Sequence, residues 1–157
     1  MLGKAERNIK MFVAMSLLFI LLAGCGSNAD VVVPIPLESG MRVRTYSGHI
    51  TETATFIPVV VGGTTMEIML VRASDNTVRA VLNTCENCHV GGRAYYVQLG
   101  NIVICQQCQM PFPVDEIGMA SAGCQPIAIG FSVENEYIVI SYDTLSANAH
   151  WFLNWRR

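Results

Sequence analysis

The stretches Cys85-Glu86-Asn87-Cys88 and Cys105-Gln106-Gln107-Cys108 decide what this chain folds around. Two residues within each pair let both sulfurs point toward one centre. Sixteen residues separate the pairs, enough for a hairpin that brings them face to face. The spacing therefore predicts that Cys85, Cys88, Cys105 and Cys108 surround one soft metal ion or a small iron–sulfur cluster.

The spacing does not identify the metal. It lies within the range of structural zinc sites, in which zinc is redox-silent and only holds the loops. An iron–sulfur cluster uses the same four thiolates. Cys88 is followed by His89, which also matches the attachment motif of c-type haem, with Met110 or Met119 as the distal ligand. Haem would leave the second pair and Cys124 without a role, so it is the weakest of the three alternatives.

The number of cysteines also bears on the site. An exported chain with six cysteines would normally form disulfides. If Cys25 carries lipid, five remain, which is an odd number, and four of them lie in Cys-x-x-Cys pairs typical of metal or redox sites. Resting disulfides and thiol–disulfide exchange stay open as alternatives. Cys124 is a candidate fifth ligand, a resolving thiol, or a buried core cysteine with no role at the site.

Residues 1–24 have the pattern of a lipoprotein signal peptide. Lys4, Arg7 and Lys10 precede an apolar run that is too short for a comfortable membrane span. The run ends in Leu22-Ala23-Gly24-Cys25, which resembles a bacterial lipobox, so we expect lipidation at Cys25 and a tether over residues 25–30. An uncleaved N-terminal anchor is the alternative. Both place the domain on the extracytoplasmic face of the membrane.

The composition of the remaining chain limits its function. Cleavage before Cys25 would leave 133 residues, enough for one domain with a core. This part has no lysine, and its seven arginines against eleven acidic residues give a net charge of about −4. Without a basic patch, no nucleic-acid partner is expected. His49, His89 and His150 are scattered, so we expect a metal-binding or electron-transfer module rather than an enzyme.

The apolar pattern predicts a mainly β fold of antiparallel strands in one small domain over residues 31–145. Few segments have helical periodicity. Residues 54–61 and 66–71 are expected to form a hairpin, and the strand over 77–82 leads to the first cysteine pair. We expect a rigid loop over 110–113 and a closing hairpin between 127–131 and 137–142.

Residues 146–157 form an aromatic and basic C-terminal tail that includes Trp151, Phe152 and Trp155. Such a segment suits the surface of a bilayer beside a lipid anchor. Packing of the aromatic rings on the domain, or a frayed end, are the alternatives.

The segment around the second pair resembles part of a Rieske-type domain. Cys105-x-x-Cys108-x-x-x-Phe112, a loop of small residues and two closing strands are similar to the second cluster-binding loop of those domains. Here cysteines occupy all four ligand positions. Four thiolates carry more negative charge than two thiolates and two imidazoles, which favours the oxidised form and lowers the reduction potential.

Residues 31–145 also resemble the FtrD-like family of exported or membrane-tethered, iron–sulfur-containing domains, whose members commonly lie beside Ftr1-type iron permeases. The resemblance is carried by five motifs: Val33-Pro34-Ile35-Pro36; Val78-Arg79-Ala80-Val81 before Cys85-x-x-Cys88; Tyr95-Tyr96; Ile104-Cys105-x-x-Cys108 with Phe112-Pro113-Val114-x-x-Ile117-Gly118; and Ala122-Gly123-Cys124-Gln125-Pro126-Ile127. The resemblance implies a metal-binding redox domain that lies at the outer face of the membrane and serves iron uptake.

The resemblance also suggests roles for single residues. The four cysteines of the two pairs match the family's presumed cluster ligands, and Cys124 matches the cysteine of a Gly-Gly-Cys-Asn-Pro loop. Gln109, Ala122 and Gln125 depart from the family's Gly, Gly and Asn, and Gln109 is expected to crowd a loop that needs a positive φ. The leader has no twin-arginine pair, so export in the unfolded state is expected. The metal would then be acquired outside the cytoplasm.

Overall fold

The computed structural model describes residues 32–119 and 123–156. The predicted signal peptide, Cys25 and the whole predicted tether lie outside the described residues. The described part is mainly β, as predicted, with eleven strands, one α-helix and three short 3-10 helices. The strands are β1 (Ile35–Leu37), β2 (Arg42–Tyr46), β3 (Thr55–Val61), β4 (Thr64–Arg72), β5 (Val78–Cys85), β6 (Tyr96–Leu99), β7 (Ile102–Cys105), β8 (Pro111–Pro113), β9 (Pro126–Ala128), β10 (Ser132–Glu134) and β11 (Tyr137–Ser141). The helices are α2 (Tyr142–Ala147), η2 (Ser47–His49), η3 (Val114–Glu116) and η4 (Ala149–Phe152).

The largest sheet has five strands in the order β1-β3-β4-β5-β9. The predicted hairpin over residues 54–71 is present as β3 and β4, which pair from Val61 with Thr64 to Thr55 with Leu70. Gly62 and Gly63 make its turn with φ of 55° and 80°, a conformation that glycine adopts without steric cost. All pairs in this sheet are antiparallel except β1 with β3, which are parallel.

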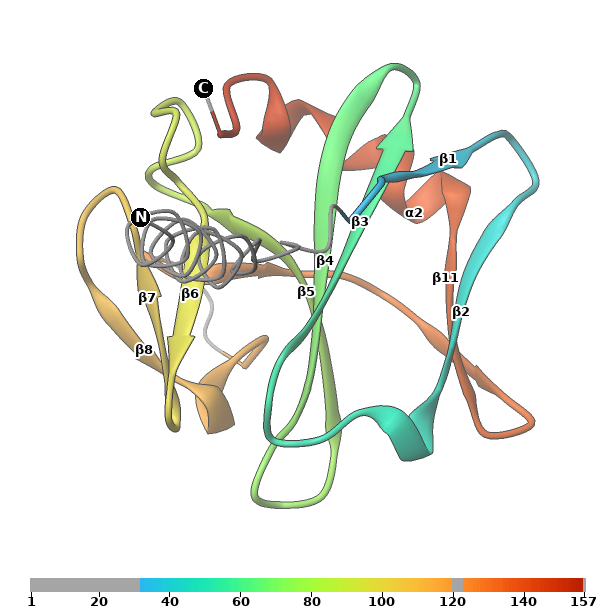
Figure 1. Cartoon of the computed structure of the whole chain (residues 1–157), viewed down its shortest axis with the longest axis horizontal. Coiled ribbons are helices and arrows are strands. Elements are labelled where there is room, and N and C mark those ends of the chain that lie inside the picture. Colours follow the sequence, from blue (N-terminus) through green and yellow to red (C-terminus); the bar gives the residue numbers. More distant parts are fainter. Residues whose placement is uncertain (1–31, 120–122, 157) are drawn as a thin grey trace, which may run out of the picture. The chain divides into compact units, whose positions relative to one another are not determined.

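Two three-stranded sheets cover the two faces of the large sheet. Figure 1 shows β6, β7 and β8 on one side of β3–β5, and β2 with β11 on the other. Residues of β4 alternate between two apolar clusters: Ile68 and Leu70 face the cluster toward β2 and β11, whereas Met69 and Val71 face the cluster toward β6–β8. Because side chains alternate along a strand, β4 is buried on both faces, and this explains its continuous apolar run.

Two predictions about the second half of the chain were wrong. Residues 110–113 were expected to be a loop, but Pro111–Pro113 form β8, an edge strand of the sheet β6-β7-β8. Proline is tolerated in an edge strand, because its missing N–H is not needed for pairing on the open side. Residues 127–131 were expected to pair with 137–142, but Pro126–Ala128 pair with β5 instead. The hairpin partner of β11 is β10, because Asn135 and Glu136 adopt φ of 49° and 68° and make a two-residue turn. The other side of β11 pairs with β2.

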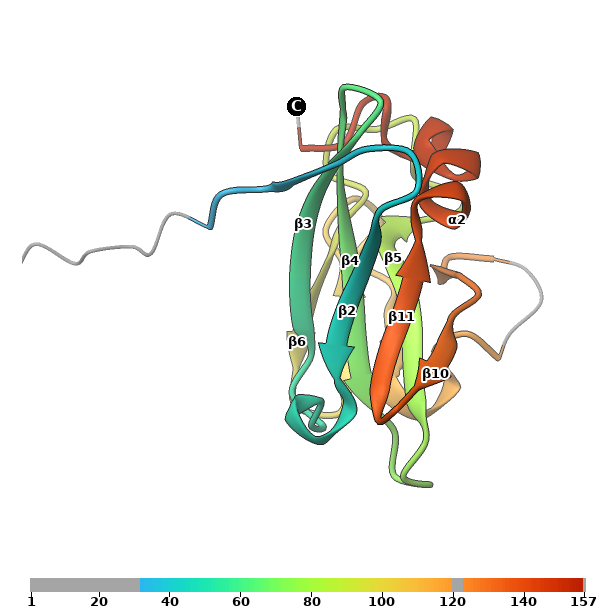
Figure 2. The same ribbon diagram turned by 90° about the vertical axis from the view of Figure 1, so that its right-hand side faces the viewer.

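The C-terminal segment packs on the domain up to Arg156. Helix α2 follows β11 at one end of the sheets (Figure 2) and is capped by Ser141, whose hydroxyl accepts a hydrogen bond from the Thr144 N–H. Phe152 is buried, and Trp155 donates its indole N–H to the Asn83 carbonyl at 2.8 Å. Of the alternatives for this segment, packing of the aromatic rings on the domain is therefore the one observed. Within the described residues, no helix has the length and apolarity to cross a membrane.

Candidate metal centre

Cys85 and Cys88 lie at the end of β5. Cys85 is the last residue of the strand, and its N–H donates to the Ala94 carbonyl at 2.8 Å. The chain then turns sharply, because the Cys88 N–H donates to the Cys85 carbonyl and the Gly91 N–H donates to the Cys88 carbonyl. These bonds fold the first cysteine pair into a compact loop at the end of β5.

Cys105 and Cys108 lie in an equivalent turn after β7. The Gln109 N–H donates to the Cys105 carbonyl at 2.8 Å, and the Cys105 N–H donates to the Met110 carbonyl at 3.2 Å. Gln109 closes this turn with φ of 60°, so the positive φ expected at this position is present although the residue is not glycine. The turn leads directly into β8.

Buried Asn83 connects the two loops. Its side-chain oxygen accepts the Tyr96 N–H at 2.7 Å, and its amide NH2 lies 3.4 Å from the Tyr96 carbonyl oxygen. This ties β5, which carries the first pair, to β6. Tyr96 in turn pairs with Cys105 of β7, which carries the second pair. Nothing in the spacing of the cysteines predicted this role of Asn83, because it depends on strands distant in sequence meeting side by side.

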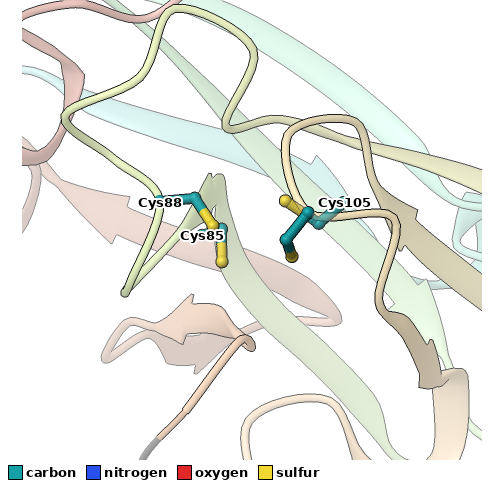
Figure 3. A group of neighbouring side chains, drawn as sticks. Cys85, Cys88 and Cys105 are labelled. Carbon is teal, nitrogen blue, oxygen red and sulfur yellow. The ribbon is translucent and has the colours of Figure 1, made fainter.

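The four paired cysteines converge at this end of the molecule. All four sulfurs lie within 4.8 Å of one another. Figure 3 shows Cys85 and Cys88 on one loop with Cys105 facing them from the other. Cys85 and Cys105 are fully buried, Cys88 is half-buried and Cys108 is exposed. The five cysteines among the described residues are all free thiols.

The spacing of the sulfurs fits a single ion closely. A tetrahedral ion with metal–sulfur bonds of about 2.3 Å separates its sulfurs by about 3.8 Å, so the group needs only a small contraction to bind one. A two-iron or four-iron cluster places thiolates on different irons and requires the pairs to move apart. The donor set suits both zinc and iron, because thiolate is a soft ligand that both metals accept.

The electrostatics of the group favour a cation. Burial raises the pKa of the Cys105 thiol to about 11. Burial, and then hydrogen bonding with Cys85 and Cys108, raises the pKa of Cys88 far above its usual range. Partial burial opposes ionisation of Cys108 as well, but hydrogen bonds from the Met110 backbone and from neighbouring thiols lower its pKa. Four adjacent thiolates repel one another, so all can ionise together only around a positive ion.

Cys124 lies beside this group without belonging to it. Its sulfur lies 4.0 Å from the side-chain amide nitrogen of Asn87. Burial, followed by interactions with Cys108 and Cys85, raises its pKa. Gln125, the next residue, reaches the first loop through its amide, which donates to the Glu86 carboxylate at 3.3 Å. The structure therefore brings the predicted fifth cysteine to the rim of the thiol group.

His89 is turned away from the sulfurs. Its Nδ1 lies 2.7 Å from the Glu86 carbonyl oxygen, and its ring packs edge-on against Trp151 at a centroid distance of 4.6 Å. Met110 and Met119, the distal ligands considered for haem, are both exposed. None of these three side chains is part of the group of converging thiols.

A comparison with protein families identifies the chain. The model described as "Membrane iron-sulfur containing protein FtrD-like" matches residues 50–152. The chain belongs to the FtrD-like family. The predicted resemblance is thereby confirmed. The family description and the four convergent cysteines identify this FtrD-like protein as a metal-binding protein of redox type.

Other comparisons give only distant similarity. No curated protein matches this FtrD-like protein. Among solved structures, the quaternary ammonium Rieske monooxygenase CntA has 15% sequence identity and a TM-score of 0.45, with 69% of this chain and 33% of that chain covered. The ferredoxin of carbazole 1,9a-dioxygenase from Nocardioides aromaticivorans IC177 has 22% identity and a TM-score of 0.38, with 66% and 98% covered. The FtrD-like chain thus spans about a third of the length of the monooxygenase chain.

Proposed function

We propose that this FtrD-like protein is an extracytoplasmic, membrane-anchored redox protein that transfers electrons or handles metal for iron transport. The observation that carries the proposal is the convergence of four free thiols from two loops to within 4.8 Å. The partner we propose is an Ftr1-type iron permease or another redox protein in the same membrane.

In the proposed centre, Cys85, Cys88, Cys105 and Cys108 hold the metal. Iron in such a site supplies one-electron chemistry through its ferrous and ferric states. Cys85 and Cys105 keep the inner side of the site dry, since both are fully buried. Cys108 is exposed and gives the centre a direct contact with the surface, which is what an electron-transfer partner needs.

The proposed location rests on the sequence and on the family description. Cys25 follows a lipobox-like segment, and its acylation would anchor the domain to the membrane. The family description names a membrane protein. A substitution of Cys25 by Ala should release the protein from the membrane fraction, which fractionation of cells with an antibody against the domain would measure. Retention of the Ala variant in the membrane would favour the uncleaved anchor.

A structural zinc site is the second candidate. It is favoured by one observation, which is that the sulfurs already lie close to the separation around a single tetrahedral ion. Zinc would hold the two loops together without redox chemistry, and the function would then depend on another surface of the domain.

Metal analysis of protein exported by its own leader separates the two candidates. The redox proposal predicts iron bound by the chain, with a sulfur-to-iron absorption band that bleaches on reduction and returns on oxidation. Quantification of acid-labile sulfide distinguishes a cluster from a single iron. One zinc per chain and no visible absorption would contradict the redox proposal. A Cys85→Ser and Cys105→Ser double variant serves as the control, because it should bind neither metal.

A further inference from the structure

Tyr96 lies between the two cysteine loops. It belongs to β6 and is directly opposite Cys105 in the register of β6 with β7. Its side chain is 1% exposed and belongs to the same buried cluster as Cys85 and Cys105. The Asn83 side chain contacts both the N–H and the carbonyl of Tyr96, which fixes this part of the β6 backbone beside β5.

The hydroxyl of Tyr96 is buried without a protein partner. Among the described residues, no group accepts or donates a hydrogen bond to this oxygen. Buried hydroxyl groups are nearly always hydrogen-bonded, and an exception calls for a specific explanation. A hydrogen-bond acceptor that forms only when the four cysteines bind a metal would satisfy the Tyr96 hydroxyl.

The thiols of Cys85 and Cys105 are among the side chains in the buried cluster that contains Tyr96, and Cys105 is its partner across the β6–β7 pair. Burial is the largest influence and raises the pKa of Tyr96 far above its usual range, and the next is the side chain of Cys85, followed by Cys105 and Cys108. A phenol hydroxyl carries its proton at neutral pH and can act as a hydrogen-bond donor. A neutral thiol is a weak acceptor, whereas a thiolate is a strong one.

We infer that Tyr96 is a positioning residue of the metal centre, whose hydroxyl donates a hydrogen bond to the Cys85 sulfur once that sulfur is a metal-bound thiolate. The inference rests on the metal site of the proposed function. The bond orients the Cys85 sulfur and withdraws part of its negative charge. It stabilises the reduced form of a redox metal, in which the sulfurs carry more charge, so it raises the reduction potential.

Titration of the full chain with Co²⁺ alone tests the inference. The Tyr96→Phe variant keeps the ring and removes only the hydroxyl. We expect its Co²⁺ affinity to fall by about 10- to 100-fold. We also expect its sulfur-to-cobalt absorption to move to longer wavelength, because a sulfur freed from a hydrogen bond gives up electron density more readily. Tyr95→Phe is the matched control: Tyr95 stacks on Arg156 at 4.7 Å and should bind Co²⁺ as the unaltered chain does.

Denaturant unfolding without metal separates this role from a structural one. Since the hydroxyl has no partner in the absence of metal, Tyr96→Phe should leave the metal-free protein at least as stable as the unaltered chain. An equal loss of stability with and without Co²⁺ would overturn the inference. So would an affinity and an absorption band identical to those of the unaltered chain. Absence of four-thiolate Co²⁺ binding by the unaltered chain would overturn the proposed function as well.

A measurement on the unaltered chain covers the case in which the variant does not fold. The Raman doublet of tyrosine reports whether the phenol donates a hydrogen bond. We expect Co²⁺ loading to move one tyrosine of the chain from the unbonded to the donor pattern. An unchanged doublet on loading would contradict the inference.

Discussion

Gln109 occupies a backbone conformation that is unfavourable for its side chain. Its φ is 60°, and a left-handed conformation costs a residue with a Cβ about 1–2 kcal/mol. The side-chain amide recovers part of that cost by donating to the Gln106 carbonyl at 3.0 Å. The turn retains this conformation because the Gln109 N–H donates a hydrogen bond to the Cys105 carbonyl. That bond fixes the loop that carries Cys105 and Cys108.

Replacement of Gln109 by Gly should therefore stabilise the protein by about 0.5–1 kcal/mol. Glycine removes the steric cost, and the exposed side-chain hydrogen bond that it also removes is weak. Urea unfolding of both proteins measures the difference. Asn76→Gly is the matched control, because Asn76 also has a positive φ, 66°, but asparagine tolerates this conformation. A larger gain at Asn76 than at Gln109 would refute the explanation.

The cysteines at the rim of the site should differ in their effect on metal binding. Cys108 belongs to the group of four sulfurs, whereas Cys124 does not. Cys108→Ser should lower the Co²⁺ affinity by about 60- to 700-fold, since one of four ligands carries roughly a quarter of a binding free energy of about 10–16 kcal/mol. Cys124→Ser should retain one Co²⁺ per chain and nearly the original affinity. Loss of four-sulfur coordination in the Cys124 variant would instead make Cys124 a ligand.

At the scale of elements, the C-terminal segment closes one end of the core between β4 and β11. Phe152 in η4 is 3% exposed and belongs to the same cluster as Leu70 and Ile140. Arg156 further along reaches the buried Glu67 carboxylate at 3.2 Å, which also accepts a hydrogen bond from Asn83. A segment that looked like a peripheral tail in the sequence thus connects to the residue that joins the two cysteine loops.

Truncation of Phe152 to Ala should cost about 3–5 kcal/mol, because it leaves a cavity in a packed core. Leu153→Ala is the matched control, since Leu153 is 61% exposed and surface changes usually stay within about 0.5 kcal/mol. Thermal or urea unfolding measures both. Equal and small effects would show that the segment does not pack on the domain in solution.

At the scale of the whole molecule, the five-stranded sheet separates two apolar clusters of different composition. The cluster toward β2 and β11 contains only apolar side chains among its buried members, whereas the one toward β6–β8 includes Cys85 and Cys105. The sheet of β6, β7 and β8 thus depends on the cysteine loops for part of its packing. Metal at the site would therefore stabilise the side of the molecule that has the smaller core.

Metal loading should raise the stability of the whole chain by an amount set by the free metal concentration. At a free Co²⁺ concentration of one hundred times Kd, the expected gain is about 2.7 kcal/mol, because the metal binds the folded state and not the unfolded one. Urea unfolding at several Co²⁺ concentrations measures it, and addition of a chelator should reverse it. A Cys85→Ser and Cys105→Ser double variant should show no gain. A gain of the same size in that variant would place the metal elsewhere.

The sequence by itself determined the local features of this protein. The apolar pattern of residues 54–61 and 66–71 predicted the hairpin of β3 and β4, because such signals act within a few residues. The two Cys-x-x-Cys pairs indicated the candidate site for the same reason, since each pair needs only its own turn. The motifs around them also carried the resemblance that the family comparison confirmed.

Only the tertiary structure decided what depends on contacts between distant segments. Pro126–Ala128 pair with β5 and not with β11, and Pro111–Pro113 form a strand, because an available sheet edge selects a partner that the local pattern does not specify. The burial of Tyr96 in one cluster with Cys85 and Cys105 follows from the pairing of β6 with β7 and from Asn83 on β5. Side chains alternate between the two faces of a strand, and only the packing of the sheets determines which face of β6 meets the cysteines.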